Sequence, residues 1–263
     1  MKLQQLLSYV RRAADDYNMI SEGDIIGVGI SGGKDSLTLL WALAELRRFY
    51  PKKYTLKAIS VNLGYAIDYS EIESLCRKLD VELTIVNTQI AQIVFDIRKE
   101  SNPCSLCAKL RKGAFNDAAV ALGCNKIAYA HHKDDVIETM LLSLVYEGRF
   151  HTFAPVTYLD RINLTLIRPL IYVNECDVAG FANKYQLPVF KNPCPADGKT
   201  TREGAHNWIK AWNTEAPGVR ERLFRAIASG TLPEWKLPEE TSSFNENRKE
   251  ITHNTESAEN NRT

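Results

Sequence analysis

The sequence has no long hydrophobic run and no large excess of charge of one sign. No apolar stretch in its 263 residues approaches the roughly 20 residues that a membrane-spanning helix needs. No secretory leader precedes the first amphipathic segment, which begins at Leu3. We therefore expect a cytoplasmic protein that does not bind membranes. A net charge of +1 argues against a strongly basic nucleic-acid binder, but it allows local basic clusters.

Two common nucleotide-binding patterns are also missing near residue 30. Gly27, Gly29 and Gly32 have the spacing of a dinucleotide fingerprint, but the first two fall within an apolar run that predicts a strand. The next expected strand also does not end in the acidic residue that would bind a ribose. Val28 replaces the first glycine of a Walker loop, and Asp35 follows the lysine where that loop has a magnesium-binding hydroxyl. Sites of both kinds are therefore excluded.

A different glycine turn is present, between an expected strand (24–30) and an expected helix (37–50). The free N–H groups and the dipole of a helix N-terminus favour a bound anion, and the glycines allow close approach of a phosphate. Lys34 supplies positive charge, the hydroxyl groups of Ser31 and Ser36 donate hydrogen bonds to the phosphates, and the Asp35 carboxylate can hold Mg²⁺ against them. The turn consists of Ser31, Gly32, Gly33, Lys34, Asp35 and Ser36.

The rest of the chain alternates between expected strands and helices up to about residue 148. This alternation predicts an α/β fold with a parallel sheet covered by helices on both faces, and a ligand at the carboxyl ends of the strands. The further strands are expected at 56–63, 81–86 and 126–130, and the further helices at 69–79, 105–122, 175–185 and 202–227. Another helix is expected to open in the segment 130–135 and to run through 140–145. We expect one domain over residues 1–235 and a disordered polar tail over 236–263.

The six cysteines fall into two groups. The first comprises Cys76, Cys124 and Cys176, which stand singly in or beside apolar helical patterns, so we expect them to be buried. Cys104 and Cys107 form a CxxC pair at an expected helix start, where both sulfurs share one face and the helix dipole lowers the thiol pKa. Such a pair alone is compatible with a redox dithiol, half a zinc site or part of an iron–sulfur site.

Cys194 is the natural third member of this group. It stands between two prolines in a stretch that is not helical, so no packing role is evident for it. Three cysteines suit a [4Fe-4S] cluster that keeps one iron free of protein ligands. A zinc site with an open position is the alternative, and a disulfide is not expected in the cytoplasm.

Basic residues cluster near these cysteines. Together they predict a surface for a phosphate backbone, with salt-sensitive nucleic-acid binding. Trp208 and Trp212 have helical spacing and are expected in the core, with base stacking as the alternative. The basic residues are Arg98, Lys99, Lys109, Arg111, Lys112, Lys199, Arg202, Lys210, Arg220, Arg222 and Arg225.

A third constellation follows the expected strand at 126–130. It contains His131, His132 and Asp135, and its position predicts that it lies at the carboxyl edge of the sheet beside the phosphate turn. Adjacent histidines on a turn point in different directions, so we do not expect them to bind one metal ion together. We interpret Asp135 as a helix-start carboxylate near ATP and magnesium.

These segments, in this order, resemble the tRNA 2-thiocytidine biosynthesis (TtcA-like) family of PP-loop sulfurtransferases. The resemblance covers about residues 24–208 and implies an ATP-dependent enzyme that thiolates tRNA, with a [4Fe-4S] cluster on Cys104, Cys107 and Cys194. It also implies roles in ATP binding and catalysis for Asp35, Arg111 and Asp135. The matching segments are SGGKDS (31–36), VNL (61–63), CSLCAKLRKG (104–113), AHHKDD (130–135), RPL (168–170) and the later Cys194.

The resemblance gives Val61 and Ala130 as further nucleotide-binding positions, although Ala130 replaces the usual glycine and the context of Cys194 differs from the bacterial pattern. The expected reaction adenylates a base carbonyl, C2 of a cytidine, and then inserts sulfur supplied as sulfide or by a cysteine desulfurase. A homodimer is favoured. Two alternatives are a PP-loop ligase of the lysidine synthetase type, which amidates tRNA without a cluster, and a non-enzymatic ATP-binding module with structural zinc.

Overall fold

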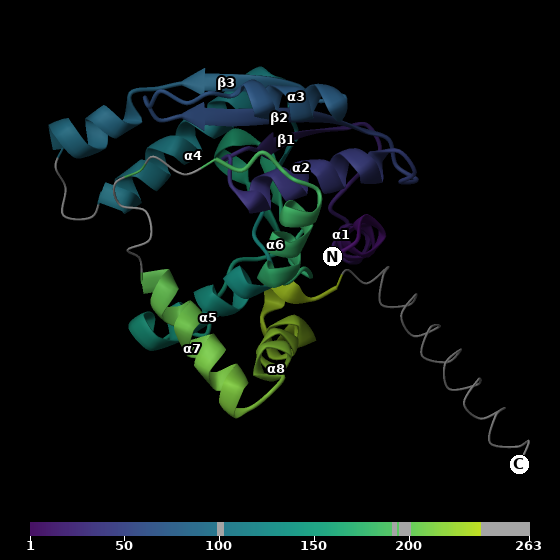
Figure 1. Cartoon of the computed structure of the whole chain (residues 1–263). Helices are drawn as coiled ribbons and strands as arrows, with labels where there is room; N and C mark the ends of the chain where they lie inside the picture. The colour runs from purple at the N-terminus through teal and green to yellow at the C-terminus, as the bar shows by residue number, and fades with distance from the viewer. Residues whose placement is uncertain (99–102, 191–193, 195–200, 238–263) are drawn as a thin grey trace, which may run out of the picture.

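A computed structural model of the chain describes residues 1–98, 103–190, 194 and 201–237 (Figure 1). A six-stranded sheet with the order β3-β2-β1-β4-β6-β5 forms its centre. All neighbouring strands are parallel except β5 and β6, which are antiparallel. The strands are β1 (Asp24–Gly29), β2 (Tyr54–Asn62), β3 (Glu82–Asn87), β4 (Lys126–Ala128), β5 (Val156–Leu159) and β6 (Leu164–Ile167).

Helices cover both faces of the sheet, and a group of C-terminal helices lies beyond its edge (Figure 1). α5, α7 and α8 pack against one another in that group. The α-helices are α1 (Leu3–Asp16), α2 (Lys34–Arg47), α3 (Ser70–Lys78), α4 (Pro103–Ala121), α5 (Lys133–Glu147), α6 (Glu175–Lys184), α7 (Thr201–Glu215) and α8 (Val219–Ala226). Shorter helical segments are η1 (Gln92–Arg98), η2 (Asp160–Ile162), η3 (Ile227–Thr231) and η4 (Pro233–Trp235).

The alternation of side chains along β1 separates two hydrophobic cores. Ile26 and Val28 face the larger core, to which α1, α2, α3, α5 and α6 contribute. Gly27 and Gly29 face the smaller core under α4, where a Cβ on Gly29 would lie 3.4 Å from the Phe115 ring. Glycine at these two positions therefore lets α4 approach the sheet closely.

The expected α/β fold is confirmed, and strands occur at all four positions that the sequence predicts. The β5–β6 hairpin was not expected, because its two strands are only four residues long and β5 is partly exposed. Asn163, with a φ of 52°, makes the tight connection between η2 and β6. The hairpin adds an antiparallel edge to a sheet that the alternating pattern predicts to be parallel throughout.

Within the described ranges, no helix is both long enough and apolar enough to cross a membrane. The expected tail begins at residue 236, and all but its first two residues lie outside the described part of the chain. The division into one domain and a tail stays a prediction.

Candidate active site

The phosphate turn joins the carboxyl end of β1 to the first turn of α2. The Ile30 N–H donates to Ile59 O at 2.8 Å, which holds the start of the turn against β2. Ser36 closes the turn, because its hydroxyl donates to Gly33 O at 2.9 Å and accepts from the Ser31 N–H at 3.2 Å. The single hydroxyl proton of Ser36 is thus used within the turn, whereas we expected it to bind phosphate directly.

Phe190 covers the phosphate turn. Its N–H donates to Gly32 O at 3.2 Å, and a Cβ on Gly32 would lie only 2.0 Å from its ring. The φ of Gly32 is +79°, a conformation that favours glycine. Since Cys194 follows four residues later, Phe190 fixes one end of the cysteine-bearing segment to the phosphate turn. The sequence offered no signal for this contact.

A cavity of about 600 Å³ opens beside the turn, at the carboxyl ends of β1, β2 and β4. The cavity lies at the edge of the sheet where the sequence predicts a ligand site. Phe115, Tyr129 and His131 give part of the wall an aromatic character. Of the predicted site residues, the wall contains Ser31, Asp35, Ser36, Val61, Arg111, Ala130 and Asp135.

The two histidines at the start of α5 point in different directions, as expected. The His131 ring packs on Phe153, with ring centroids 4.7 Å apart. His132 is 5% exposed and caps α5: its Nδ1 accepts from the Asp135 N–H at 3.4 Å, and Asp135 Oδ2 accepts from the His132 N–H at 2.9 Å. His132 Nε2 also lies 4.0 Å from Asp35 Oδ1, so the α5 cap and the phosphate turn share one polar region.

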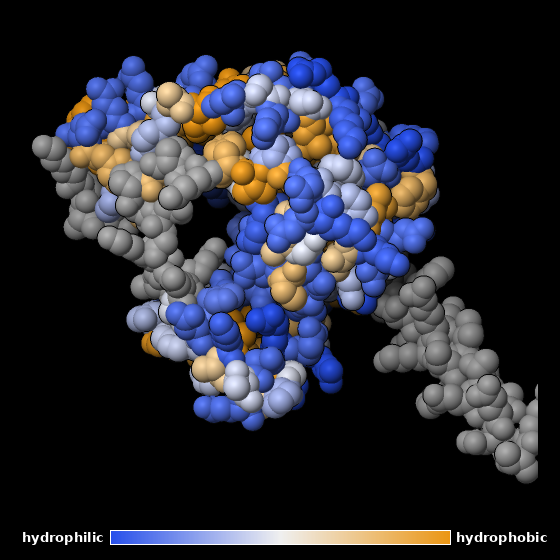
Figure 2. Space-filling model, viewed as in Figure 1, coloured by the Kyte–Doolittle hydropathy of each residue, from blue (hydrophilic) through white to orange (hydrophobic). Residues whose placement is uncertain are grey.

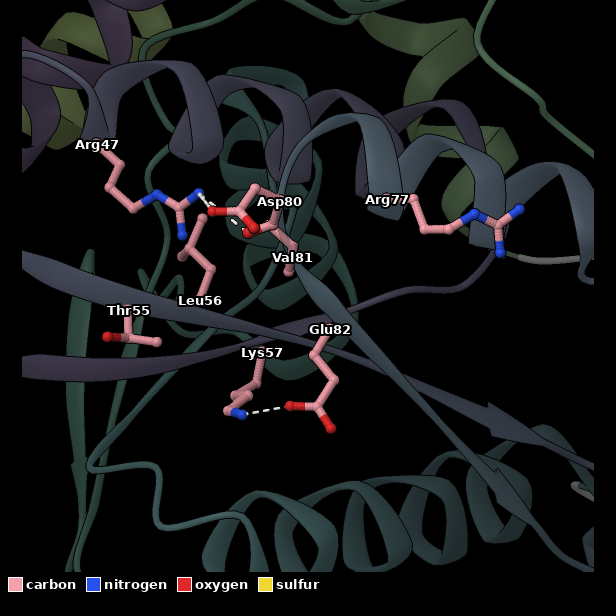
Figure 3. Close-up of a pocket in the computed structure, with 8 residues that line it drawn as sticks. All are labelled: Arg47, Thr55, Leu56, Lys57, Arg77, Asp80, Val81 and Glu82. Carbon is pink, nitrogen blue, oxygen red and sulfur yellow. Dashed lines mark hydrogen bonds and ion pairs between the residues drawn. The ribbon is translucent and has the colours of Figure 1, made fainter.

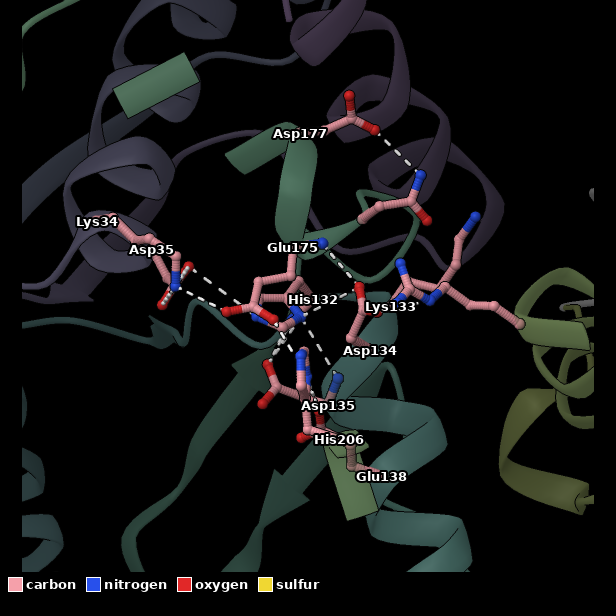
Figure 4. A network of polar contacts seen from close by, with 12 residues as sticks. Lys34, Asp35, His132, Lys133, Asp134, Asp135, Glu138, Glu175, Asp177 and His206 are labelled. Carbon is pink, nitrogen blue, oxygen red and sulfur yellow. Dashed lines mark hydrogen bonds and ion pairs between the residues drawn. The ribbon is translucent and has the colours of Figure 1, made fainter. Parts of the chain in front are cut away.

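A network of charged side chains surrounds Lys34 (Figure 4). Lys34 Nζ lies 3.2 Å from Asp35 Oδ1 and 3.1 Å from Glu175 Oε1 at the start of α6. Burial alone would lower the pKa of Lys34, but the two carboxylates raise it above its ordinary value. Burial likewise opposes the charge of Glu175, yet its hydrogen bond from Lys34 holds the pKa of this carboxyl below its ordinary value. Lys34 is therefore fully protonated at neutral pH.

The network continues into the C-terminal helices. Asp134, which is 1% exposed, accepts from the Glu175 N–H at 2.7 Å and lies 3.0 Å from Arg220 Nε on α8. His206 Nδ1 on α7 lies 3.2 Å from Glu138 Oε1 and 3.6 Å from Glu175 Oε2. Sequence reasoning gave these residues no role at the site. The acidic start of the expected helix at 175 was a visible cue, but nothing indicated its partner 141 residues away.

None of the three predicted cysteine ligands is in a disulfide bond, and Cys104 and Cys194 lie close enough to Cys107 to affect its pKa. Burial is the main cause of a raised pKa at Cys107; Arg111 lowers this pKa, and the thiolates of Cys194 and Cys104 raise it further. The expectation that the helix dipole lowers the thiol pKa is therefore wrong for Cys107. Among the described residues, no three potential ligands are grouped closely enough to hold a metal ion. The three thiols interact electrostatically without forming a closed site.

The other cysteines behave differently from one another. Cys76 and Cys124 are buried, as expected, and burial raises the pKa of both thiols, to about 11 at Cys76. Cys176 is exposed on α6, so the expectation of burial is wrong for this residue. Its place in an apolar pattern did not reveal which face of the helix it occupies.

Only some of the basic residues predicted to bind a phosphate backbone are exposed and unengaged within the described part of the fold. Lys109, Arg111 and Lys112 are exposed on α4. Arg220 pairs with Asp134, and Arg222 donates to the carbonyls of residues 216 and 217, so both serve the fold. Lys99, Lys199 and the side chain of Arg202 lie outside what the structure describes. Hydrophilic side chains cover most of the face in Figure 2.

The two tryptophans of α7 are not core residues. Trp212 is 40% exposed, and Trp208 is partly buried and stacks on Tyr146, with centroids 6.5 Å apart. The expectation that both lie in the core is therefore wrong. Leu144, Val145 and Tyr146 on the neighbouring α5 are exposed as well.

A second hollow, of about 490 Å³, lies at the opposite ends of β2 and β3 (Figure 3). Its basic groups are paired: Arg47 contacts Asp80, and Lys57 contacts Glu82. Arg77 points away from these pairs in Figure 3. Because its charges are satisfied within the fold and it lies at the amino ends of the strands, this hollow is a poor candidate for the active site.

Comparisons with known proteins agree with this geometry. A family model described as a PP-loop domain matches residues 4–209. The tRNA-cytidine(32) 2-sulfurtransferase of Geobacter metallireducens is 38% identical over 235 residues, which cover 87% of this chain and 90% of that protein. The chain belongs to the PP-loop family of tRNA-cytidine(32) 2-sulfurtransferases.

Other proteins are similar to this chain over most of its length. The enzyme of the same name from Syntrophotalea carbinolica is 37% identical and covers 83% of this chain and 86% of its own length. Among solved structures, the U34-tRNA thiolase NcsA from Methanococcus maripaludis, described with its [4Fe-4S] cluster, superposes with a TM-score of 0.68. It is 22% identical and covers 85% of this chain and 76% of its own, so this similarity shows the PP-loop fold.

Proposed function

We propose that the chain is an ATP-dependent tRNA sulfurtransferase that converts the C2 carbonyl of a cytidine in tRNA into a thiocarbonyl. One observation carries the proposal. The phosphate turn and the helix of the CxxC pair both line the same cavity, the turn through Ser31 and Asp35 and the helix through Ala108 and Arg111. A nucleotide bound at the turn would therefore react beside the cysteine-bearing helix.

In this proposal the N-terminus of α2 and the charge of Lys34 bind the β and γ phosphates of ATP. Asp35 and Asp135 lie on the cavity wall and would hold Mg²⁺ against the phosphates. The C2 oxygen of the base attacks the α phosphorus and expels pyrophosphate, so the base becomes adenylated. Lys34 and Arg111 stabilise the negative charge that develops on the phosphates.

Sulfide then attacks C2 of the adenylated base. The C–O bond breaks, AMP leaves with the former carbonyl oxygen, and the C2–sulfur bond becomes a thiocarbonyl. Neither base nor sulfide changes oxidation state in this exchange. Free sulfide serves directly, whereas the persulfide sulfur of a cysteine desulfurase must first be released as sulfide by a thiol reductant, which is oxidised to a disulfide. The expected homodimer stays a prediction.

The donor set fits an iron–sulfur cluster. Cys104, Cys107 and Cys194 are not in disulfide bonds, and Cys107 interacts electrostatically with both of the others, while thiolates are the usual ligands of such clusters. These three residues would hold a [4Fe-4S] cluster that offers an iron without a protein ligand to exogenous sulfide. Arg111 lowers the pKa of Cys107 and so favours its thiolate form, which a metal ligand must adopt.

The test combines anaerobic purification with variants. We expect the wild-type protein to contain iron and to release AMP and pyrophosphate only when tRNA is added, with 2-thiocytidine detected by mass spectrometry of the nucleosides. Cys107→Ser and Cys194→Ser should lose iron and thiolation. Cys176→Ser, which changes an exposed cysteine outside the trio, should keep both. AMP release with tRNA but without iron dependence would instead indicate an amidating ligase.

A further inference from the structure

We propose that Glu175 is a positioning residue for Lys34, a role that rests on the proposed adenylation at the phosphate turn. Its Oε1 lies 3.1 Å from Lys34 Nζ, and the two residues are 141 positions apart in the sequence. Figure 4 shows the Glu175 side chain directed from the start of α6 toward Lys34. The side chains of Lys34 and Glu175 are each about one-third exposed, so the pair lies at the edge of the site.

Glu175 is itself held at two points. Its N–H donates to Asp134 Oδ2 at 2.7 Å, and Asp134 is buried and paired with Arg220 of α8. Its second carboxylate oxygen, Oε2, lies 3.6 Å from His206 Nδ1 of α7. The backbone of Glu175 is thus fixed by α5 and its side chain by α7, while α8 holds Asp134 in place through Arg220. A carboxylate fixed in this way can define the position of a flexible partner.

Lys34 needs such a partner. Its four-carbon stem has several rotatable bonds, and its other contact, Asp35, is the next residue in the chain and moves with it. Glu175 is the contact that comes from outside the phosphate turn. It therefore fixes the ammonium group relative to the rest of the fold, at the N-terminus of α2 where the departing pyrophosphate would develop charge.

The experiment compares Glu175→Gln with Asp177→Asn in the full-length protein. Asp177 lies on the same helix, and its carboxylate accepts from Asn174 rather than from a residue of the phosphate turn. We expect Glu175→Gln to lower kcat for tRNA-dependent pyrophosphate release by about 10- to 100-fold, the size of effect that misplacement of a reacting group produces. The KM for ATP should change much less, and Asp177→Asn should behave like the wild type. Glu175→Asp should recover part of the loss.

A second measurement needs no turnover. An amine reagent is applied to the substrate-free protein at one fixed pH, and labelling of Lys34 is quantified by mass spectrometry. We expect labelling to increase in Glu175→Gln, because its ion pair is lost, and to stay unchanged in Asp177→Asn. Equal labelling and equal kcat in the two variants would overturn the inference, as would a faster Glu175→Gln enzyme. If the Lys34 labelling follows the expected pattern but the wild-type protein releases no pyrophosphate with tRNA, the proposed function is contradicted and the role of Glu175 in positioning Lys34 is not.

Discussion

At the scale of single residues, the phosphate turn depends on Gly32. This residue combines a φ of +79° with the ring of Phe190 directly over its Cα, so both the backbone conformation and the space exclude a side chain. Gly33, its neighbour, has a φ of −82° and its nearest would-be contact is Ser31 Oγ at 3.4 Å. The two adjacent glycines therefore serve different purposes.

We expect Gly32→Ala to weaken ATP binding at least about tenfold, because a left-handed alanine costs about 1–2 kcal/mol before the clash with Phe190 is counted. Gly33→Ala is the matched control and should change affinity by less than about threefold, since neither its φ nor its surroundings oppose a methyl group. Isothermal titration with ATP measures both. Similar losses in the two variants would contradict the assigned role of Gly32.

The thiol of Cys107 gives a pH-dependent prediction. Arg111 lowers the pKa of this thiol, so Arg111→Gln should raise it and leave less thiolate at a given pH. The alkylation rate of Cys107 by iodoacetamide in the metal-free protein should then reach its midpoint at higher pH than in the wild type. Lys109→Gln, an exposed charge on the same helix, is the control and should leave the midpoint in place. A lower midpoint in Arg111→Gln would show that the sign is wrong.

At the scale of elements, the N-terminus of α5 is the point where three helices meet. Its buried Asp134 accepts from the first N–H of α6 and pairs with Arg220 of α8. The same turn carries His132 and Asp135, which cap α5, and Asp135 also lines the cavity. The first turn of α5 therefore contributes both to the packing of α6 and α8 and to the geometry of the site.

We expect Asp134→Ala to reduce the free energy of unfolding by about 3–5 kcal/mol, because it leaves Arg220 and a helix N-terminus without their buried partner. Asp160→Ala, an exposed aspartate in η2, should change stability by less than about 0.5 kcal/mol. Urea denaturation followed by circular dichroism measures both. Equal urea midpoints for Asp134→Ala and Asp160→Ala would mean that Asp134 does not hold the helices together.

At the scale of the whole molecule, the C-terminal segment returns to the first helix. Trp235 in η4 is 1% exposed and packs edge-on against Tyr17, at the end of α1, and against Phe224 of α8. The ring contact with Tyr17 joins residues at opposite ends of the described chain. Trp235, which follows all the strands and α8 in the chain, therefore completes the larger core against α1.

Removal of residues 238–263 should leave the free energy of unfolding unchanged within about 0.5 kcal/mol, because every contact described for Trp235 is retained. Trp235→Ala in the full-length chain should lower it by about 3–5 kcal/mol through the cavity that remains. Thermal and urea denaturation of the two proteins tests this contrast. A truncated protein as unstable as Trp235→Ala would show that the tail contributes to the fold.

The sequence by itself determined the positions of the strands β1 to β4, the phosphate turn and the different directions of the two histidines. These features depend on local information: apolar periodicity, glycine at a strand end and the geometry of adjacent residues. The expected cavity at the carboxyl ends of the strands follows from the same alternation. The family resemblance then supplied the roles of Arg111 and the three cysteines.

Only the tertiary structure decided which distant side chains complete the site. Glu175 meets Lys34, Phe190 covers Gly32, and Asp134 pairs with Arg220, and each contact joins segments that no local pattern relates. The raised pKa of Cys107 and the exposure of Cys176 were also decided at this level, because burial depends on what packs over a helix face. Local periodicity fixes which elements form, whereas long-range packing fixes which charges meet and how far they are shielded from water.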